Sequence, residues 1–213
     1  MTPTLQRRRR PHAAAAAALA LAALALGAAA APATARTVLT DGHVDAVAPA
    51  LPGGRLRSLL NDGGTWRDPD AVTIRLGSAA RVTLPAGMGF VGRRGTRAWL
   101  IPQAPRRGVV WAGWSTEAVP ARAVRGGVTW TLTSVSGPGR VAIFQTGAFG
   151  RASILFSSAR RLPQARTLAT GTHAHGNWAF TRPGTYRLGY RLSARTATGR
   201  TLSDSSTLTF AVG

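Results

Sequence analysis

The sequence predicts an all-β fold, specifically an immunoglobulin-like antiparallel β-sandwich. Three observations carry this prediction: short runs alternate apolar and polar residues, Gly and Pro interrupt the chain at short intervals, and helix signals are scarce after residue 35. Alternation at period 2 turns one side of a strand toward the core and the other toward solvent. Many such strands, each limited by turns, are typical of a sandwich.

The chain begins with a predicted cleavable signal peptide, residues 1–35. Arg7–Arg10 give a basic start, residues 13–31 form an uncharged Ala/Leu run, and Ala33-Thr34-Ala35 supplies small residues for a signal peptidase. An uncleaved membrane anchor is the alternative, because the run is just long enough to span a bilayer. We expect cleavage, since alanine is only weakly apolar. The expected mature protein after cleavage is one domain, residues 36–213, that is secreted or associated with the cell envelope and has no transmembrane segment.

The predicted strands of this domain are separated by turn residues. The clearest is 186–194, in which Tyr and Leu at even positions alternate with Arg, Gly and Ser. Ser136-Gly-Pro-Gly139 predicts a hairpin, and Pro183-Gly184-Thr185-Tyr186 resembles the tyrosine corner of immunoglobulin-like sandwiches. Residues 88–117, rich in Trp, Pro and Gly, predict a loop-rich insertion. In chain order the expected strands are residues 38–47, 71–76, 80–84, 98–101, 128–133, 141–145, 186–194 and 207–212.

Composition excludes several classes of function. The chain has no cysteine, which rules out disulfides, a lipoprotein anchor, Cys-ligated zinc and thiol catalysis. The formal charge of +20 comes entirely from arginine, and it falls to +16 without Arg7–Arg10. Because these arginines are scattered and form no basic stripe, we expect no nucleic-acid partner. Loose association with anionic cell-wall polymers is the expected effect of such a charge.

The histidines of the expected mature domain predict a metal site. His173 and His175 occupy alternate positions, so on a strand they point to one face about 7 Å apart. The same spacing places His43 on one face with Asp41 and Asp45. Imidazole and carboxylate groups are ligands for zinc and similar divalent transition metals. If the two motifs meet, three imidazoles and one carboxylate, from Asp41 or Asp45, could hold one ion.

Other interpretations of these residues stay open. The histidines could be solvated or structural, since His-x-His is common on exposed strands. Trp111 and Trp114 could form an exposed platform for glycans or cell-wall polymers. Catalytic patterns are weak: no Ser stands in a nucleophile elbow, and Asp68-Pro69-Asp70 fits a turn better than a carboxylate pair. We therefore expect no enzyme.

Several motifs together resemble one family. They are VLTDGHVD (38–45), WRDPDAV (66–72), WAGWSTE (111–117), GGVTWTLTSVSGPGRVAIFQTGAFG (126–150) and GTHAHGNWAF with the following PGTY (171–186). The chain in this respect resembles actinobacterial surface-anchored repeat proteins of the choice-of-anchor M domain type. Members of that family occur beside ABC transporters of the metal-binding type. The resemblance implies an accessory receptor for a metal ion.

The combined expectation is a non-enzymatic, extracytoplasmic surface domain that binds a divalent transition metal, zinc first, and otherwise no cofactor. Its expected partners are components of a metal-type ABC transporter or other envelope proteins. The predicted ligands are His43, His173 and His175, completed by Asp41 or Asp45. The alternatives are a glycan-binding module and a purely structural surface domain.

Overall fold

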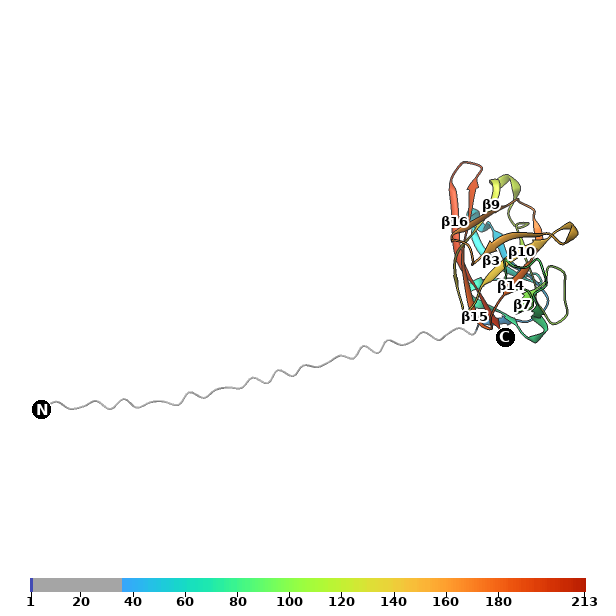
Figure 1. The fold of residues 1–213 in the computed structure, drawn as a ribbon. Coiled ribbons are helices and arrows are strands. Elements are labelled where there is room, and N and C mark those ends of the chain that lie inside the picture. Colours follow the sequence, from blue (N-terminus) through green and yellow to red (C-terminus); the bar gives the residue numbers. More distant parts are fainter. Residues whose placement is uncertain (2–35) are drawn as a thin grey trace. The chain divides into compact units, whose positions relative to one another are not determined.

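Three β-sheets build the fold in a computed structural model that describes Met1 and residues 36–213 (Figure 1). The predicted signal peptide lies outside the described residues. The first sheet, in spatial order, consists of β1 (Thr37–Leu39), β5 (Val72–Leu76), β16 (Thr201–Val212), β15 (Gly184–Thr196), β9 (Val124–Ser136) and β12 (Gln164–Leu168). Its long β15–β16 hairpin, red in Figure 1, lies along one side of the fold.

The other two sheets have five strands each. The second consists of β11 (Ala152–Ser157), β10 (Val141–Thr146), β14 (Asn177–Phe180), β7 (Arg97–Ile101) and β6 (Arg81–Thr83). The third consists of β13 (His173–His175), β8 (Trp111–Ser115), β2 (His43–Ala50), β3 (Arg57–Asp62) and β4 (Thr65–Arg67). The described helices are 3-10 turns of three residues: η1 (Pro52–Gly54), η2 (Pro69–Ala71), η3 (Ser78–Ala80), η4 (Ala121–Ala123) and η5 (Ala148–Gly150). None of the described helices is long and apolar enough to cross a membrane.

The all-β prediction is confirmed, with two differences in detail. Pairing is mostly antiparallel, but β1–β5, β5–β16 and β2–β8 are parallel, so the sheets are mixed. The expected loop-rich insertion at 88–117 is wrong in part, because β7 and β8 within it occupy inner positions of two sheets. Their apolar side chains pack against the core. The Gly and Pro residues around these two strands led to the prediction of loops.

The tyrosine corner is confirmed. The hydroxyl of Tyr186 donates to the carbonyl oxygen of Arg182 at 2.8 Å and accepts from the Arg182 backbone N–H at 3.2 Å. The glycines of the preceding hairpin make room for this ring. A Cβ on Gly137 would overlap it, and one on Gly139 would lie 2.7 Å from the hydroxyl. The corner therefore ties the β9–β10 turn to the start of β15.

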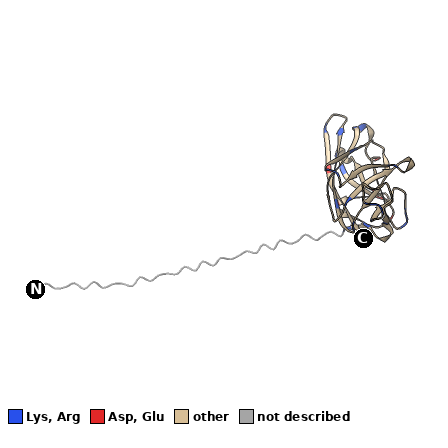
Figure 2. Ribbon diagram, in the orientation of Figure 1, with Lys and Arg blue, Asp and Glu red and all other residues tan. Residues whose placement is uncertain are grey.

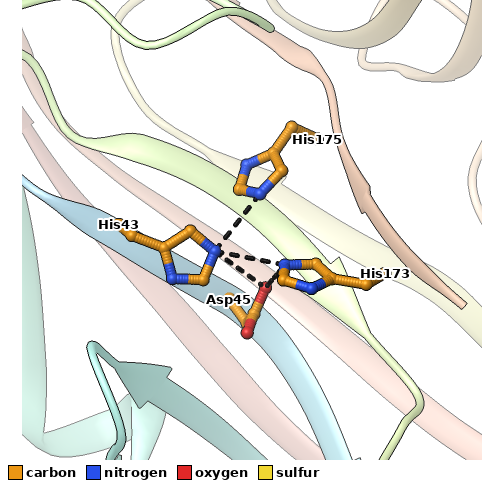
Figure 3. Close-up of side chains that lie close together, drawn as sticks. All are labelled: His43, Asp45, His173 and His175. Carbon is orange, nitrogen blue, oxygen red and sulfur yellow. Dashed lines mark hydrogen bonds and ion pairs between the residues drawn. The ribbon is translucent and has the colours of Figure 1, made fainter.

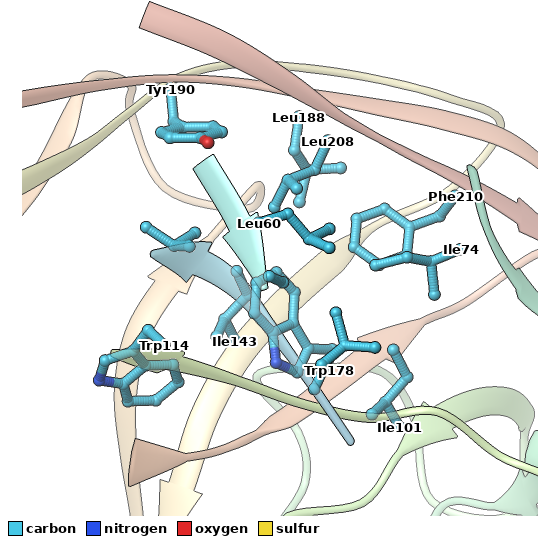
Figure 4. Close-up of a cluster of buried hydrophobic side chains, with 14 of the residues drawn as sticks. Leu60, Ile74, Ile101, Trp114, Ile143, Trp178, Leu188, Tyr190, Leu208 and Phe210 are labelled. Atoms are coloured by element: carbon cyan, nitrogen blue, oxygen red, sulfur yellow. The ribbon is translucent and has the colours of Figure 1, made fainter. Parts of the chain in front are cut away.

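One core joins all three sheets (Figure 4). Trp130 of the first sheet lies with its ring 6.0 Å from that of Trp178 in the second, and Trp178 lies 5.7 Å from Phe210. Leu60 of the third sheet is fully buried in the same cluster. Full burial of one such side chain stabilises the fold by about 1.5–3 kcal/mol. Without disulfides, this packing supports the frame on which the third sheet holds its edge strands.

Candidate metal centre

Strand β2 supplies two of the clustered side chains. His43 and Asp45 stand at alternate positions at its start and so share one face of the sheet. Directly after Asp45 the register of β2 slips against both neighbours, which marks a β-bulge. Asp45 is only 3% exposed, an unusual position for a carboxylate in a strand that is otherwise apolar in its interior.

Strand β13 supplies the other two from the edge of the same sheet. His173 pairs with Ser115 of β8 and His175 with Gly113, while Asp45 pairs with Gly113 from the other side. The two strands that bear the clustered side chains are therefore separated by β8 alone. Gly113 lets them converge over it, because a Cβ there would lie 2.8 Å from Nδ1 of His175 and 2.5 Å from the carbonyl oxygen of Ala174.

The four side chains point their donor atoms at one another (Figure 3). Nε2 of His43 lies 3.1 Å from Nε2 of His173 and 3.2 Å from Nε2 of His175. Oδ1 of Asp45 lies 3.1 Å from Nε2 of His173 and 3.6 Å from Nε2 of His43. One donor atom from each of the four residues can be chosen so that all lie within 4.8 Å of one another.

Hydrogen bonds cannot account for all of these close contacts at once. A ring nitrogen offers either one proton or one lone pair, so Nε2 of His43 can make one good hydrogen bond and not two. Oδ1 of Asp45 is buried, and no donor among the described residues is aligned with it, although His173 is close. A buried acceptor without a donor is costly. A cation at the common centre would accept all four lone pairs at once.

The spacing fits a four-coordinate ion. A tetrahedral zinc ion with bonds of about 2.0–2.1 Å separates its ligand atoms by about 3.3 Å. Four of the six separations between the ligand atoms, 3.1 to 3.6 Å, bracket that value, and the other two lie within 4.8 Å. The residues of this cluster could therefore hold a metal ion, and we call His43, Asp45, His173 and His175 the histidine–aspartate cluster.

Neighbouring groups orient the rings. Oε2 of Glu117 lies 3.3 Å from Nδ1 of His173 and accepts a hydrogen bond from the hydroxyl of Ser115. A carboxylate this close to Nδ1 favours the tautomer with the proton on Nδ1, in which Nε2 carries the free lone pair. Trp111 stacks on His175 with ring centroids 3.8 Å apart and an interplanar angle of 13°. Gln145 donates to the carbonyl oxygen of His175 at 2.9 Å, so the second sheet also anchors β13.

The electrostatics favour a neutral ring at His175. Burial, followed by the neighbouring His43 and His173, lowers the pKa of His175 to about 4. The ring of His175 is therefore neutral at neutral pH, and in the tautomer with the proton on Nδ1 its Nε2 is available as a ligand. Burial raises the pKa of Asp45, which the two nearest histidines partly offset. Asp45 and His175 are thus the two members of the cluster whose charged forms are poorly solvated.

Asp41 does not belong to the cluster, so Asp45 is the carboxylate that lies with the three histidines. Its Oδ1 accepts from the backbone N–H of Gly42 at 2.8 Å, and its Oδ2 from that of Gly108 at 3.2 Å. It thus stabilises the turn that leads into β2. The Asp-Gly turn interrupts the alternation, so Asp41 and His43 are not on one strand face.

The predicted exposed Trp111–Trp114 platform is wrong. Trp114 is 2% exposed, and its ring packs 5.8 Å from that of Trp130 in the core. Trp111 is partly buried against His175, and its Nε1 donates to the carbonyl oxygen of Gln103 at 2.8 Å. Side chains on a strand share a face only at even spacings, and these two tryptophans are three positions apart on β8. They therefore point to opposite faces of the strand.

Sequence reasoning missed two residues that shape the site, Gly113 and Glu117. Both lie in the WAGWSTE segment, in or directly after a strand. A glycine inside a strand signals a close approach of another group, which was the available clue to Gly113. Glu117 offered a weaker clue as the only glutamate in the chain.

Comparison of the chain with protein-family models, with curated proteins and with solved structures finds no match. The resemblance to choice-of-anchor M domain proteins therefore stays a prediction, and the argument for function depends on the geometry of the cluster.

Proposed function

We propose that this protein is a non-enzymatic receptor for a divalent transition metal ion, zinc first, held by His43, Asp45, His173 and His175. The observation that carries the proposal is the convergence of three imidazole nitrogens and one buried carboxylate oxygen at ligand spacing. Nε2 of His43 is shared between two other imidazoles, and Oδ1 of Asp45 has no aligned donor among the described residues.

The donor set favours particular ions. Three nitrogens and one oxygen suit zinc, copper(II) and related borderline ions, whereas calcium and magnesium prefer oxygen alone. The cluster contains no sulfur donor, so it lacks the soft ligands that select copper(I). Zinc also accepts a tetrahedral arrangement without a penalty from its d electrons.

Binding and release fit the site better than catalysis does. A catalytic zinc usually has three protein ligands and an open position for water, whereas here four side chains are available to close the shell. The side chains of His43 and His173 are 30% and 38% exposed, so an ion can enter and leave from solvent. A site in which protein side chains supply all four ligands, and in which two of these side chains are partly exposed to solvent, suits reversible capture of an ion.

The cellular setting belongs to the same proposal. The signal-peptide pattern supports a location outside the cytoplasm, and the resemblance to choice-of-anchor M domain proteins supports delivery of the ion to a metal-type ABC transporter. The alternative of a purely structural surface domain predicts the same fold but no ion.

Calorimetry on the metal-stripped full chain tests the proposal. Zinc, copper(II) and manganese(II) are titrated at pH 7.5. We expect zinc or copper to bind with a Kd well below a threshold of 100 μM, which corresponds to a binding free energy of about −5.5 kcal/mol. Asp45→Asn should weaken binding at least tenfold. Asp41→Asn is the matched control, since Asp41 stands the same distance from His43 in sequence but outside the cluster. If no ion binds more tightly than 100 μM, the histidines are structural.

A further inference from the structure

A hollow of about 510 Å³ lies apart from the histidine–aspartate cluster and has none of the cluster residues in its wall. It lies where the β9–β10 turn, the β14–β15 turn and the start of β7 meet. Arg97, Arg140 and Arg182 line it together with Thr96 and Thr181, and none of its lining residues is acidic. This arginine hollow therefore concentrates positive charge in a concave place.

The three guanidinium groups have no partner in the part of the chain that the structure describes. Among residues 36–213 their side chains make no hydrogen bond that fits the usual geometry and no ion pair, whereas Arg67 is bound by Asp62 at 3.0 Å. Figure 2 shows basic residues at several separate places on the fold and few acidic ones. Low-dielectric walls around unpaired cations focus the field on whatever enters the hollow.

The backbone of the hollow is preorganised. The N–H of Arg140 donates to Oγ1 of Thr181 at 2.8 Å, and the N–H of Thr181 donates to the carbonyl oxygen of Arg140 at 3.1 Å. Arg182 is held on both its backbone groups by the hydroxyl of Tyr186. The two arginines thus project from loops that are locked to each other. Since Oγ1 of Thr181 accepts from Arg140, its own proton is free to bind a ligand.

We propose that the arginine hollow binds a phosphate monoester. The guanidinium fork matches two phosphate oxygens in one plane, which a point charge such as lysine does not. A monoester carries about −1.5 to −2 charges and three acceptor oxygens. Three arginines and one hydroxyl donor match that demand better than they match a singly charged carboxylate. The ester is either a small soluble molecule or the headgroup of a lipid.

Titration of the full chain, with chelator present to remove metal, tests the hollow directly. The soluble probes are inorganic phosphate and glycerol 3-phosphate, with Kd expected below about 1 mM at low salt, where screening is weak. Arg140→Gln with Arg182→Gln should weaken binding at least tenfold, and the matched Lys pair should lose affinity while keeping the charge. The control pair Arg125→Gln with Arg195→Gln removes the same charge from a different hollow and should change the affinity less than twofold.

Vesicles containing phosphatidic acid identify the source of the ester. Recruitment to them that is lost in the Arg140/Arg182 pair assigns the hollow to a lipid headgroup, and binding of the soluble probes alone assigns it to a small ester. Equal recruitment to phosphatidylglycerol, a diester, would overturn the proposal. So would equal weakening by both Gln pairs, or no saturable binding of any probe, in variants whose circular dichroism shows an intact fold.

Discussion

Gly113→Ala should weaken metal binding at the histidine–aspartate cluster without altering any of the four proposed ligands. The new Cβ would lie 2.5 Å from the carbonyl oxygen of Ala174, whereas ordinary contact begins at 3.4 Å. Since β13 is a three-residue edge strand, it must yield by about 0.9 Å, the difference between these two values. Metal–ligand distances tolerate only about ±0.2 Å. His175 therefore leaves the position at which it can share an ion with His43.

The expected loss is about 10–100-fold in zinc affinity, the range typical of disturbed groups around a metal site. Competition between the protein and a zinc-binding dye measures it. Gly77→Ala is the control, because a Cβ at Gly77 meets nothing within 4 Å and its backbone is extended. Zinc affinity within twofold of wild type in folded Gly113→Ala would refute the claim that this glycine lets the ligands converge.

Three further predictions follow from the same contacts. Glu117→Gln should lower zinc affinity about tenfold, because Nδ1 of His173 loses the carboxylate that holds its proton; dye competition measures the change. Stability of the metal-free protein should fall as pH drops from about 6.5 toward 4, since the unfolded chain takes up a proton at His175 that the folded chain, with a pKa of about 4, refuses. Asp45, whose pKa is raised by burial, acts in the opposite direction. The urea midpoints of wild type and His175→Asn are therefore compared at each pH, and identical pH slopes for the two proteins would contradict the argument. Tyr186→Phe should cost about 1 kcal/mol of unfolding free energy, because it removes both hydrogen bonds to the Arg182 backbone, and should leave zinc affinity unchanged.

Local patterns predicted the strands well where one face is buried. In β15 alternate residues are buried and the rest largely exposed, as the Tyr/Leu alternation indicates. The prediction was poorer where a strand is covered on both faces. Residues 44–49 of β2 are all buried, so no alternation marks the true extent of the strand, and the predicted strand at 38–47 merges β1 with β2.

Part of the histidine–aspartate cluster was also visible in the sequence. The spacing of His173 and His175 put both on one face, and His43 with Asp41 and Asp45 on either side suggested a second half. The choice between Asp41 and Asp45 was not visible, because it depends on where the turn ends and β2 begins. The exposure of Trp114 was judged from the Gly-rich stretch around it, whereas the strand places its ring in the core.

The sequence by itself determined the strand-rich fold, the tyrosine corner and the residue types that can bind a metal, because each depends on neighbours a few positions apart. Only the tertiary structure decided that residues 130 positions apart in the chain share a site, through β8, which pairs with β2 on one side and β13 on the other. Strand order is set by which apolar faces pack together across the whole core, and that cooperative choice leaves no local mark in the sequence.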